Sequence, residues 1–321
     1  MGRRHAENLR RLLPQARLVA VADVDGLRAR QVAEELEIEL AYESTEALVE
    51  RKDIQAVVIA SPPGAHPESI RAAATAGKHI LCEKPLALSL EAADSALEAV
   101  TRAQVQFQIG HMRRYDPAYV TAMKRLEAGE IGEPVIFKSI GRDADAPPPR
   151  SYENPLNGHL FLESTVHDFD LARWLMRDEV VELHAFAGVR AMPDLANYGG
   201  FDSGTVNLRF SGGAIGNVES FICARYGYDV RTEIVGTQGT LFVGSVRATA
   251  LEVFTEAGSG RDVVRHFLVR FADAYLAEMR DFVDAVITGR PTSVTARDGR
   301  QSLALSLAAE KSYREGRPIR L

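Results

Sequence analysis

The chain has 321 residues, 46% of them hydrophobic, and a formal net charge of −6 at neutral pH. This length provides one large or two ordinary domains with an ample core, and the acidic balance argues against a nucleic-acid-binding protein. The sequence has no apolar stretch of about eighteen residues and no apolar segment after its basic start, so neither a transmembrane helix nor a secretory leader is expected.

The first third of the chain alternates short apolar runs with segments of helical spacing. Strands are predicted at 17–23, 54–63, 79–85 and 104–110, and helices at 26–36, 64–78 and 89–103. Gly77 is placed to end one helix and Ser89 to begin the next. Strands that alternate with helices indicate right-handed βαβ units, so residues 1–116 are predicted to form an α/β domain with a parallel sheet. The two cysteines, Cys82 and Cys223, form no CxxC motif and are expected to be free thiols.

The pattern changes near Asp116. A helix predicted over 116–130 is followed by strands with period-two alternation, at 134–142, 205–213, 214–225, 228–236 and 239–245. Residues 117–321 are therefore predicted to form an α+β domain with an antiparallel sheet, ending in a helix at about 297–315. The Pro- and Asn-rich stretch 143–159 is predicted to be a long loop, and such loops are often lids or binding segments.

The start of the chain has the pattern of the second half of a dinucleotide-binding unit. In such a unit a Gly-rich turn brings the pyrophosphate to a helix N-terminus, and an acidic residue about 20 positions later bonds the ribose. Gly2 occupies the position of the third glycine, and Asp23 follows the apolar run 18–22. A carboxylate there repels a 2′-phosphate, which favours NAD over NADP. The alternative is that Asp23 is only a turn residue.

The first strand and the first two glycines of this unit would lie before Met1. We therefore expect the natural chain to carry about ten more residues, judged from typical strand and turn lengths. Met1 would then be an internal residue of the Gly-rich turn. Without this central strand, two strand edges of the sheet are expected to be exposed.

Several motifs in this chain resemble one enzyme family. "LCEKPLA" (81–87), "ASPPGAH" (60–66) and "STVHDFDLARWL" (164–175) are together similar to the glucose–fructose oxidoreductase/inositol dehydrogenase (Gfo/Idh/MocA) family. "RYGYDVRTEIVGTQGTLF" (225–242), "GHMRRYDP" (110–117) and "GRD" (141–143) resemble its myo-inositol 2-dehydrogenase branch. The resemblance covers essentially the whole chain. It implies a Rossmann-type NAD-binding domain, then an α+β domain with a large open antiparallel sheet that commonly supports homodimers or homotetramers.

The resemblance also implies how the chemistry is divided. Oxidising a secondary alcohol requires a base for the hydroxyl proton and a donor that stabilises the alkoxide, while the cofactor takes the hydride. Lys84, after a predicted parallel strand, is implied to contact cofactor and substrate. His167 is the candidate base. The family has a carboxylate four residues earlier, usually Asp; Glu163 stands here, and on one helix it would share a face with His167.

Further contacts follow from the same resemblance. The implied cofactor-binding residues are Gly2, Asp23, Ser61, His66, Glu83 and Lys84, and the implied substrate-binding residues are Arg113, Asp143 and Tyr228. Each desolvated hydroxyl needs a donor or an acceptor, so this polar lining suits a cyclitol or sugar.

Simpler interpretations of these residues remain open. Lys84 alone fits a surface lysine paired with Glu83, and His66 fits a cap of the following helix. The remaining residues with a structural alternative are Arg113 and Arg114 as solvated charges, Asp168 and Asp170 as residues at a helix surface or cap, and Tyr228 and Trp174 as core aromatics.

A metal site is a further alternative. His159, Glu163 and His167 recur every four residues and would line up as ligands on one continuous helix. Asn157 and Gly158 indicate a loop instead, so His159 is expected to lie off the helix and no metal is expected.

The sequence as a whole predicts NAD-dependent oxidation of a cyclitol or sugar, most simply of myo-inositol to 2-keto-myo-inositol (scyllo-inosose), by a cytoplasmic homo-oligomer. One alternative is a sugar dehydrogenase of the same family, acting on an aldose or anhydrosugar, which the loop 143–159 and Glu163 favour. The other is a dinucleotide-binding sensor without catalysis, which the incomplete Gly-rich turn favours. No nucleic-acid or membrane partner is expected.

Overall fold

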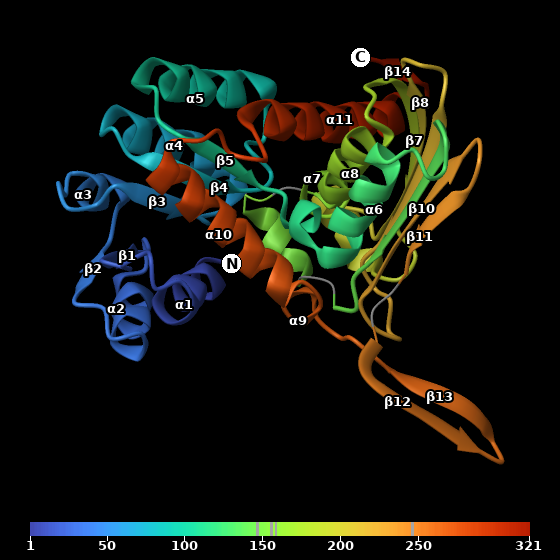
Figure 1. Ribbon diagram of the computed structural model, residues 1–321, viewed down its shortest axis with the longest axis horizontal. Helices are drawn as coiled ribbons and strands as arrows, with labels where there is room; N and C mark the ends of the chain where they lie inside the picture. Colours follow the sequence, from blue (N-terminus) through green and yellow to red (C-terminus); the bar gives the residue numbers. More distant parts are fainter. Residues whose placement is uncertain (146–147, 155–156, 158, 245–246) are drawn as a thin grey trace. The chain divides into compact units, whose positions relative to one another are not determined.

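The computed structural model describes residues 1–145, 148–154, 157, 159–244 and 247–321. The chain forms two compact units (Figure 1). The first contains Met1–Met112 and Asp273–Leu303, and the second contains Arg113–Ala272 and Ala304–Leu321. The division at residue 116 made from the sequence differs in assigning 273–303 to the second domain. These residues belong with the first because Met279 and Phe282 pack into one buried cluster with Leu13 and Leu81, a contact that local patterns do not reveal.

The first unit alternates short strands with helices, as predicted. Its elements are α1 (Gly2–Leu12), β1 (Ala20–Ala22), α2 (Gly26–Glu35), β2 (Leu40–Tyr42), α3 (Thr45–Val49), β3 (Ala56–Ile59), η1 (Pro63–Ala65), α4 (His66–Thr75), β4 (His79–Glu83), α5 (Leu90–Ala103), β5 (Phe107–Gly110), α10 (Ala272–Thr288) and the start of α11 (Ala296–Glu315). Gly77 follows α4 with a φ of +69°, and the Ser89 hydroxyl accepts from the Ala92 N–H at 3.2 Å to begin α5. The local patterns of the sequence did not indicate β2, α3 or α10.

The parallel strands of the first unit are divided between two sheets. β1 pairs with β2, whereas β4 lies between β3 and β5. Among the described residues, β1 pairs only with β2, and β3 pairs only with β4. This arrangement places the segments after β3, β4 and β5 at the carboxyl end of one parallel sheet, where open α/β sheets bind ligands.

The second unit is built on a seven-stranded sheet. Its elements are η2 (Met112–Tyr115, which begins in the first unit), α6 (Pro117–Glu127), β6 (Pro134–Arg142), η3 (Pro149–Glu153), α7 (Leu160–Glu163), α8 (Val166–Met176), β7 (Val180–Gly188), η4 (Pro193–Tyr198), β8 (Ser203–Phe210), β9 (Ile215–Phe221), β10 (Asp229–Gly236), β11 (Thr240–Val243), β12 (Arg247–Thr255), β13 (Gly258–Val263), α9 (Phe267–Arg270), the end of α11, and β14 (Ile319–Arg320). Residues 146–147, 155–156 and 158 of the expected loop and residue 245 of an expected strand lie outside the described residues.

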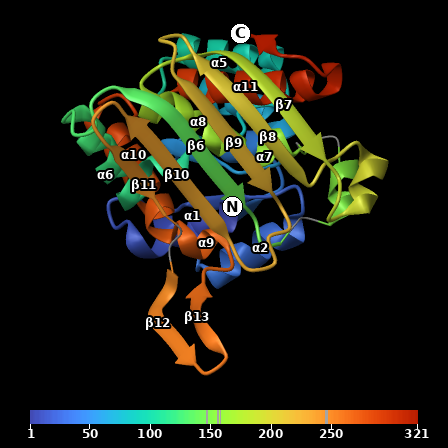
Figure 2. The ribbon, with the colours of Figure 1, turned by 90° about the vertical axis from the view of Figure 1, so that its right-hand side faces the viewer.

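The sheet is mixed rather than purely antiparallel. Its order is β11-β10-β6-β9-β8-β7-β14, and β6 and β9 run parallel. A hairpin does not join these two neighbours; α7, α8, β7 and β8 intervene, so β9 enters the sheet in the same direction as β6. Helices α6, α7 and α8 lie against one face, and Figure 2 looks onto the other.

Two further features complete the second unit. The hairpin β12–β13 projects away from the seven-stranded sheet (Figures 1 and 2), with Leu251, Val253 and Phe254 exposed. Trp174 is partly buried against the main core cluster, as the sequence predicts. None of the helices among the described residues is long and apolar enough to cross a membrane.

The alternation along β6 makes a direct prediction about stability. Phe137 is fully buried in the core, whereas Val135 on the same strand is 37% exposed. Phe137→Ala should lower the free energy of unfolding by about 3–5 kcal/mol through lost burial and a cavity. Val135→Ala, the matched control, should change it by less than about 1 kcal/mol. Chemical denaturation measures both values, and equal losses would contradict the described core.

Candidate active site

In the first unit, one buried histidine joins the segments that follow β3 and β4. His66 Nε2 lies 2.8 Å from the Ser61 carbonyl oxygen, and Nδ1 lies 2.8 Å from the Pro85 carbonyl oxygen. Both partners are carbonyl acceptors, and a neutral imidazole carries one N–H, so the ring donates to one of them at a time. The His66 side chain therefore does not cap α4; it fixes the "SPPGAH" and "CEKP" motifs against each other.

Lys84 and Glu83 have different surroundings at the end of β4. Lys84 is half-buried and is followed by a cis peptide bond to Pro85. Glu83 is buried, and its carboxylate accepts a hydrogen bond from His5 Nε2 at 2.7 Å. Burial favours the neutral acid, but the bond to His5 and the nearby charges hold the Glu83 pKa below its usual range. An exposed Lys84–Glu83 ion pair is thus contradicted by the burial of Glu83.

The start of α1 fits a dinucleotide phosphate. The helix begins at Gly2, and Met1 provides no side-chain cap, so the first N–H groups are available to an anion. Ser61 Oγ is buried without a hydrogen-bond partner among the described residues, which leaves a polar group for a ligand. A Cβ on Gly2 would meet the Ala60 Cβ at 3.7 Å, an ordinary contact, so packing does not by itself require glycine there.

Asp23 lies directly after β1, where a ribose-binding carboxylate is expected. One oxygen accepts from the Asp25 N–H at 2.9 Å, and the other lies 3.4 Å from Arg28 Nη1. The residue therefore serves the turn into α2, as its simpler interpretation holds. Its side chain is also 30% exposed, so its carboxylate remains accessible to a hydroxyl donor.

In the second unit, a buried ion pair lies next to the substrate residues implied by the sequence. Arg113 Nη1 lies 2.7 Å from Asp168 Oδ1, which also accepts from Ser139 Oγ at 2.6 Å. Arg113 also shares a hydrogen bond with Tyr228. A Cβ at Gly141 would lie 3.2 Å from Asp168 Oδ2, so the glycine of "GRD" gives this carboxylate room. Burial raises the Tyr228 pKa well above its usual value.

The adjacent arginine is also paired. Arg114 donates to both carboxylate oxygens of Asp170, at 2.8 and 2.6 Å, and its guanidinium lies over the Trp174 ring. The interpretation of Arg113 and Arg114 as solvated charges is therefore wrong. Asp168 and Asp170 are buried ion-pair partners rather than residues at a helix surface. In the sequence, two adjacent arginines ("RR", 113–114) match two aspartates two positions apart ("DFD", 168–170). The two segments lie more than 50 residues apart, so the sequence did not show that they pair.

Glu163 and His167 do not lie on one continuous helix. Glu163 ends α7 and His167 is in the first turn of α8. The two hydroxyl residues between them bond elsewhere: Ser164 Oγ donates to Asp143 Oδ2 at 2.7 Å, and Thr165 Oγ1 pairs with Ser220 Oγ at 2.9 Å. Thr165 Oγ1 also donates to the Leu160 carbonyl oxygen at 3.3 Å, a local side-chain bond of the kind that competes with helical hydrogen bonding. The same Ser164 contact fixes the Asp143 carboxylate beside α7.

Tyr152, from the loop after β6, is a candidate site residue that the sequence analysis did not single out. Its ring stacks on His159, with centroids 5.5 Å apart. Burial, followed by the charges of Glu163, Cys223 and Asp143, raises its pKa to about 12. These charges act on Tyr152 because two of the proposed site carboxylates lie near it. Tyr152 lies near these carboxylates only in the folded chain, and no local pattern in the Pro-rich segment indicates this.

The helical metal-site alternative has no geometric support. His159 precedes α7 with an extended backbone, as expected, so it is off the helix. Within the described ranges, His159, Glu163 and His167 do not bring three ligand atoms within 4.8 Å of one another; a different set, His5, Glu83 and Glu278, does.

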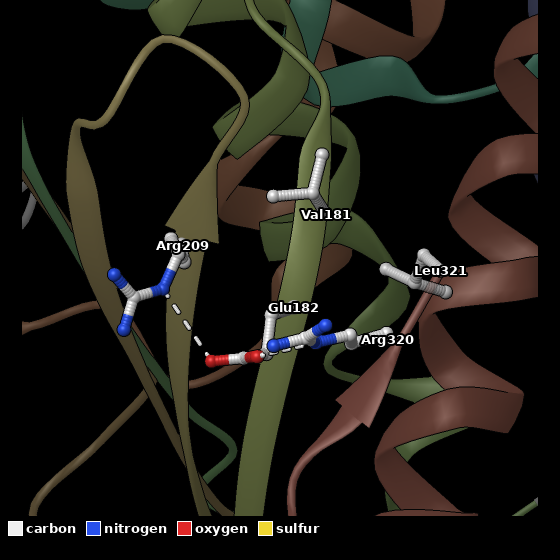
Figure 3. A pocket seen from close by; sticks show the side chains of 5 residues that line it. All are labelled: Val181, Glu182, Arg209, Arg320 and Leu321. Atoms are coloured by element: carbon white, nitrogen blue, oxygen red, sulfur yellow. Dashed lines mark hydrogen bonds and ion pairs between the residues drawn. The ribbon is translucent and has the colours of Figure 1, made fainter.

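A pocket of about 620 Å³ lies elsewhere, where β14 joins the sheet edge (Figure 3). Val181, Glu182, Arg209, Arg320 and Leu321 line it. Glu182 accepts from Arg209 and Arg320 at 3.4 and 3.3 Å, and the Arg320 side chain is 88% exposed. None of the expected site residues lines this pocket.

Comparison with known proteins identifies the family. Residues 1–111 match the model "Oxidoreductase family, NAD-binding Rossmann fold", and residues 119–242 match the GFO/IDH/MocA C-terminal domain. The chain belongs to the GFO/IDH/MocA oxidoreductase family. Its GFO/IDH/MocA relatives include the NAD(+)-dependent scyllo-inositol 2-dehydrogenase of Bacillus subtilis (strain 168), which is 38% identical over all of this chain and 93% of the relative.

Two further GFO/IDH/MocA proteins agree with this assignment. Myo-inositol 2-dehydrogenase of Thermotoga maritima is 38% identical, over all of this chain and 96% of its own length. The crystal structure of scyllo-inositol dehydrogenase from Lactobacillus casei with bound NAD(H) and scyllo-inositol has a TM-score of 0.93 and 30% identity, and the match covers 99% of this chain and 95% of that one. The first unit is therefore an NAD-binding Rossmann-type domain, although its pairing of strands is divided.

The buried Arg113–Asp168 pair should be sensitive to the loss of one partner. Asp168→Asn should lower the free energy of unfolding by about 3–5 kcal/mol, because it leaves the Arg113 charge uncompensated. Replacing both residues, as Arg113→Met with Asp168→Leu, should be less harmful than the sum of the single changes. Glu130→Gln, in the exposed pair with Arg125, should cost at most about 1 kcal/mol. Denaturant titrations measure the free energy of unfolding of each variant. A loss in the double variant equal to the sum of the losses in the two single variants would contradict the pairing.

Proposed function

We propose that the protein is an NAD-dependent inositol 2-dehydrogenase that oxidises myo-inositol to 2-keto-myo-inositol. The observation that carries this proposal is 38% identity, across the whole chain, to both a scyllo- and a myo-inositol 2-dehydrogenase. The motifs "LCEKPLA", with Lys84, and "STVHDFDLARWL", with His167, lie within the residues that these matches cover. In this proposal the first unit binds NAD, and the second unit binds the polyol and supports a homodimer or homotetramer in the cytoplasm.

Cofactor binding is assigned to one edge of the parallel strands. Gly2 and the N–H groups of α1 bind the pyrophosphate, and Asp23 bonds the adenosine ribose. Ser61, His66 and Lys84 border the rest of the dinucleotide. Glu83 is buried and contributes indirectly, because it helps to hold the neighbouring Lys84 in position. The buried Ser61 hydroxyl and the accessible Asp23 carboxylate support these roles.

The reaction needs three functions from the side chains. When bound, NAD accepts the hydride that leaves the alcohol carbon. His167 accepts the hydroxyl proton, because a neutral imidazole is a base near neutral pH. Lys84 donates a hydrogen bond to the developing alkoxide and relays the proton. Glu163 orients His167 from the end of α7, across the turn rather than along a helix face.

Polyol recognition is assigned to Arg113, Asp143 and Tyr228. Their fixed positions support this role: Asp168 holds Arg113, Ser164 holds Asp143, and Arg113 bonds Tyr228. Side chains held in this way lose little freedom when a substrate binds, which favours affinity and selectivity among polyols. A sugar as the substrate is a second candidate, because Tyr152 places an aromatic ring near Asp143 and Glu163.

Lys84→Met tests the catalytic assignment. With NAD and myo-inositol, it should lower kcat at least about 100-fold, because it removes the proposed alkoxide donor. Lys124→Met, at an exposed position on α6, is the control and should retain wild-type turnover. Absorbance of the reduced cofactor measures both. Full turnover by Lys84→Met would refute the mechanism, and no turnover of any inositol by wild-type protein would refute the substrate assignment.

A panel that includes scyllo-inositol, aldoses and anhydrosugars separates the enzymatic alternatives. Calorimetric titration with NADH separates an enzyme from a sensor. NADH binding without turnover of any compound in the panel would favour the sensor. Absence of NADH binding would count against both the enzyme and the sensor.

Asp23→Ser tests the cofactor assignment. The variant should lower the preference for NAD over NADP by about tenfold or more, because it removes the repulsion of a 2′-phosphate and one ribose acceptor. The ratio of kcat/KM for the two cofactors measures the change. Asp25→Ser, in the same turn, is the control, and an equal change in both variants would contradict a direct contact by Asp23.

A further inference from the structure

A buried cluster of three titratable side chains lies behind the Glu-Lys-Pro turn of the first unit. His5 comes from α1, Glu83 from β4 and Glu278 from α10, and one ligand-type atom from each lies within 4.8 Å of the other two. All three side chains are buried, and Glu278 has no exposed surface. The reaction proposed above uses neither His5 nor Glu278.

The hydrogen bonds in this cluster are distributed unequally. His5 Nε2 donates to Glu83 at 2.7 Å, and the edge of the His5 ring packs against the Tyr275 ring. Both carboxyl oxygens of Glu278, in contrast, are buried without a hydrogen-bond partner among the described residues. An ionised carboxylate in such a position is very unfavourable, and a second carboxylate close by makes it more so.

We propose that Glu278 is held as a neutral carboxylic acid and acts, through Glu83, as a positioning residue for Lys84. As a neutral group, Glu278 leaves the Glu83 carboxylate free to keep its bond to His5. If Glu278 lost its proton, its charge would repel Glu83 and disturb the end of β4, where Lys84 follows directly. The consequence for Lys84 rests on the proposed function, whereas the protonation state of Glu278 does not.

The electrostatic surroundings agree with this state. The titratable groups that act on Glu278 are His5 on α1, Glu83 at the end of β4 and Asp281 on α10. Lys84 and the amino group of Met1 act in turn on Glu83, and Tyr275 packs against His5. Burial, then the charges of Glu83 and Asp281, raise the Glu278 pKa well above its usual value. A group whose pKa is raised on folding binds more protons in the native state, so its contribution to stability falls as pH rises towards that folded pKa.

A divalent cation is the rival explanation for three buried ligands. Around a tetrahedral zinc ion, with bonds of about 2.0–2.1 Å, ligand atoms lie about 3.3 Å apart. The 2.7 Å contact between His5 and Glu83 is instead that of a direct hydrogen bond. The observed geometry therefore favours a protonated Glu278 over a cation bound by the three side chains. The test below includes a measurement of bound metal.

The test compares wild-type protein with Glu278→Gln, in which a neutral amide of the same shape replaces the neutral acid. Glu98→Gln, at an exposed position on α5, is the control. In infrared difference spectra near neutral pH, wild-type protein should show the C=O band of a protonated carboxyl group, which Glu278→Gln lacks. The melting temperature of Glu278→Gln relative to wild type should rise between about pH 5 and pH 8. Glu98→Gln should show neither effect.

The positioning role is measured by NADH affinity as a function of pH, without inositol, so that a wrong substrate assignment cannot obscure it. Wild-type protein should lose affinity several-fold on the alkaline side, and Glu278→Gln should lose much less. An equal loss in both proteins would overturn the positioning role. Three results would overturn the neutral state: no protonated-carboxyl band, a Glu278→Gln variant that is unfolded or increasingly destabilised as pH rises, or one bound divalent metal per wild-type chain that the variant lacks.

Discussion

The buried ion pair between Arg113 and Asp168 is the contact on which the second unit's polar side chains depend. It joins η2 to α8, and through Ser139 it also joins both to β6. β6 leads directly to Asp143, α8 carries His167, and Arg113 bonds Tyr228. Small displacements of a buried charge pair are costly, because each charge has lost its contacts with water and is compensated only by its partner. The same contact that stabilises the unit therefore also sets the relative positions of its proposed substrate residues.

The sequence was most informative where a local pattern and a local cause coincide. Ser89 begins α5 through its own hydroxyl, and the alternation around Phe137 marks β6 to the residue. The motifs around Lys84 and His167 were recognisable because short segments hold them. Family membership and the NAD-binding fold were accordingly predictable from the sequence.

Contacts between distant segments account for what the sequence analysis missed. The pattern of α10 does not say that Met279 packs with Leu13 and Leu81. Asp168 looks like a helix-surface residue until β6 and η2 are placed beside it. The spacing of Glu163 and His167 suggested one helix, but α7 ends at Glu163 and α8 begins at Val166. Between them, Ser164 and Thr165 bond the distant residues Asp143 and Ser220. In each case a partner far along the chain decided the outcome.

The return of residues 273–303 to the first unit has a consequence for how the chain is made. Leu13 and Leu81 pack in one buried cluster with Met279 and Phe282, so this part of the core needs all four side chains. During synthesis, these residues emerge from the ribosome only after most of the second unit. The dinucleotide domain, although it comes first in the sequence, cannot finish its own core until residues 113–272 of the second unit have been made. Its nascent form must therefore stay incompletely packed while the other unit is being made, which exposes it to chaperones and proteases for longer than a contiguous domain.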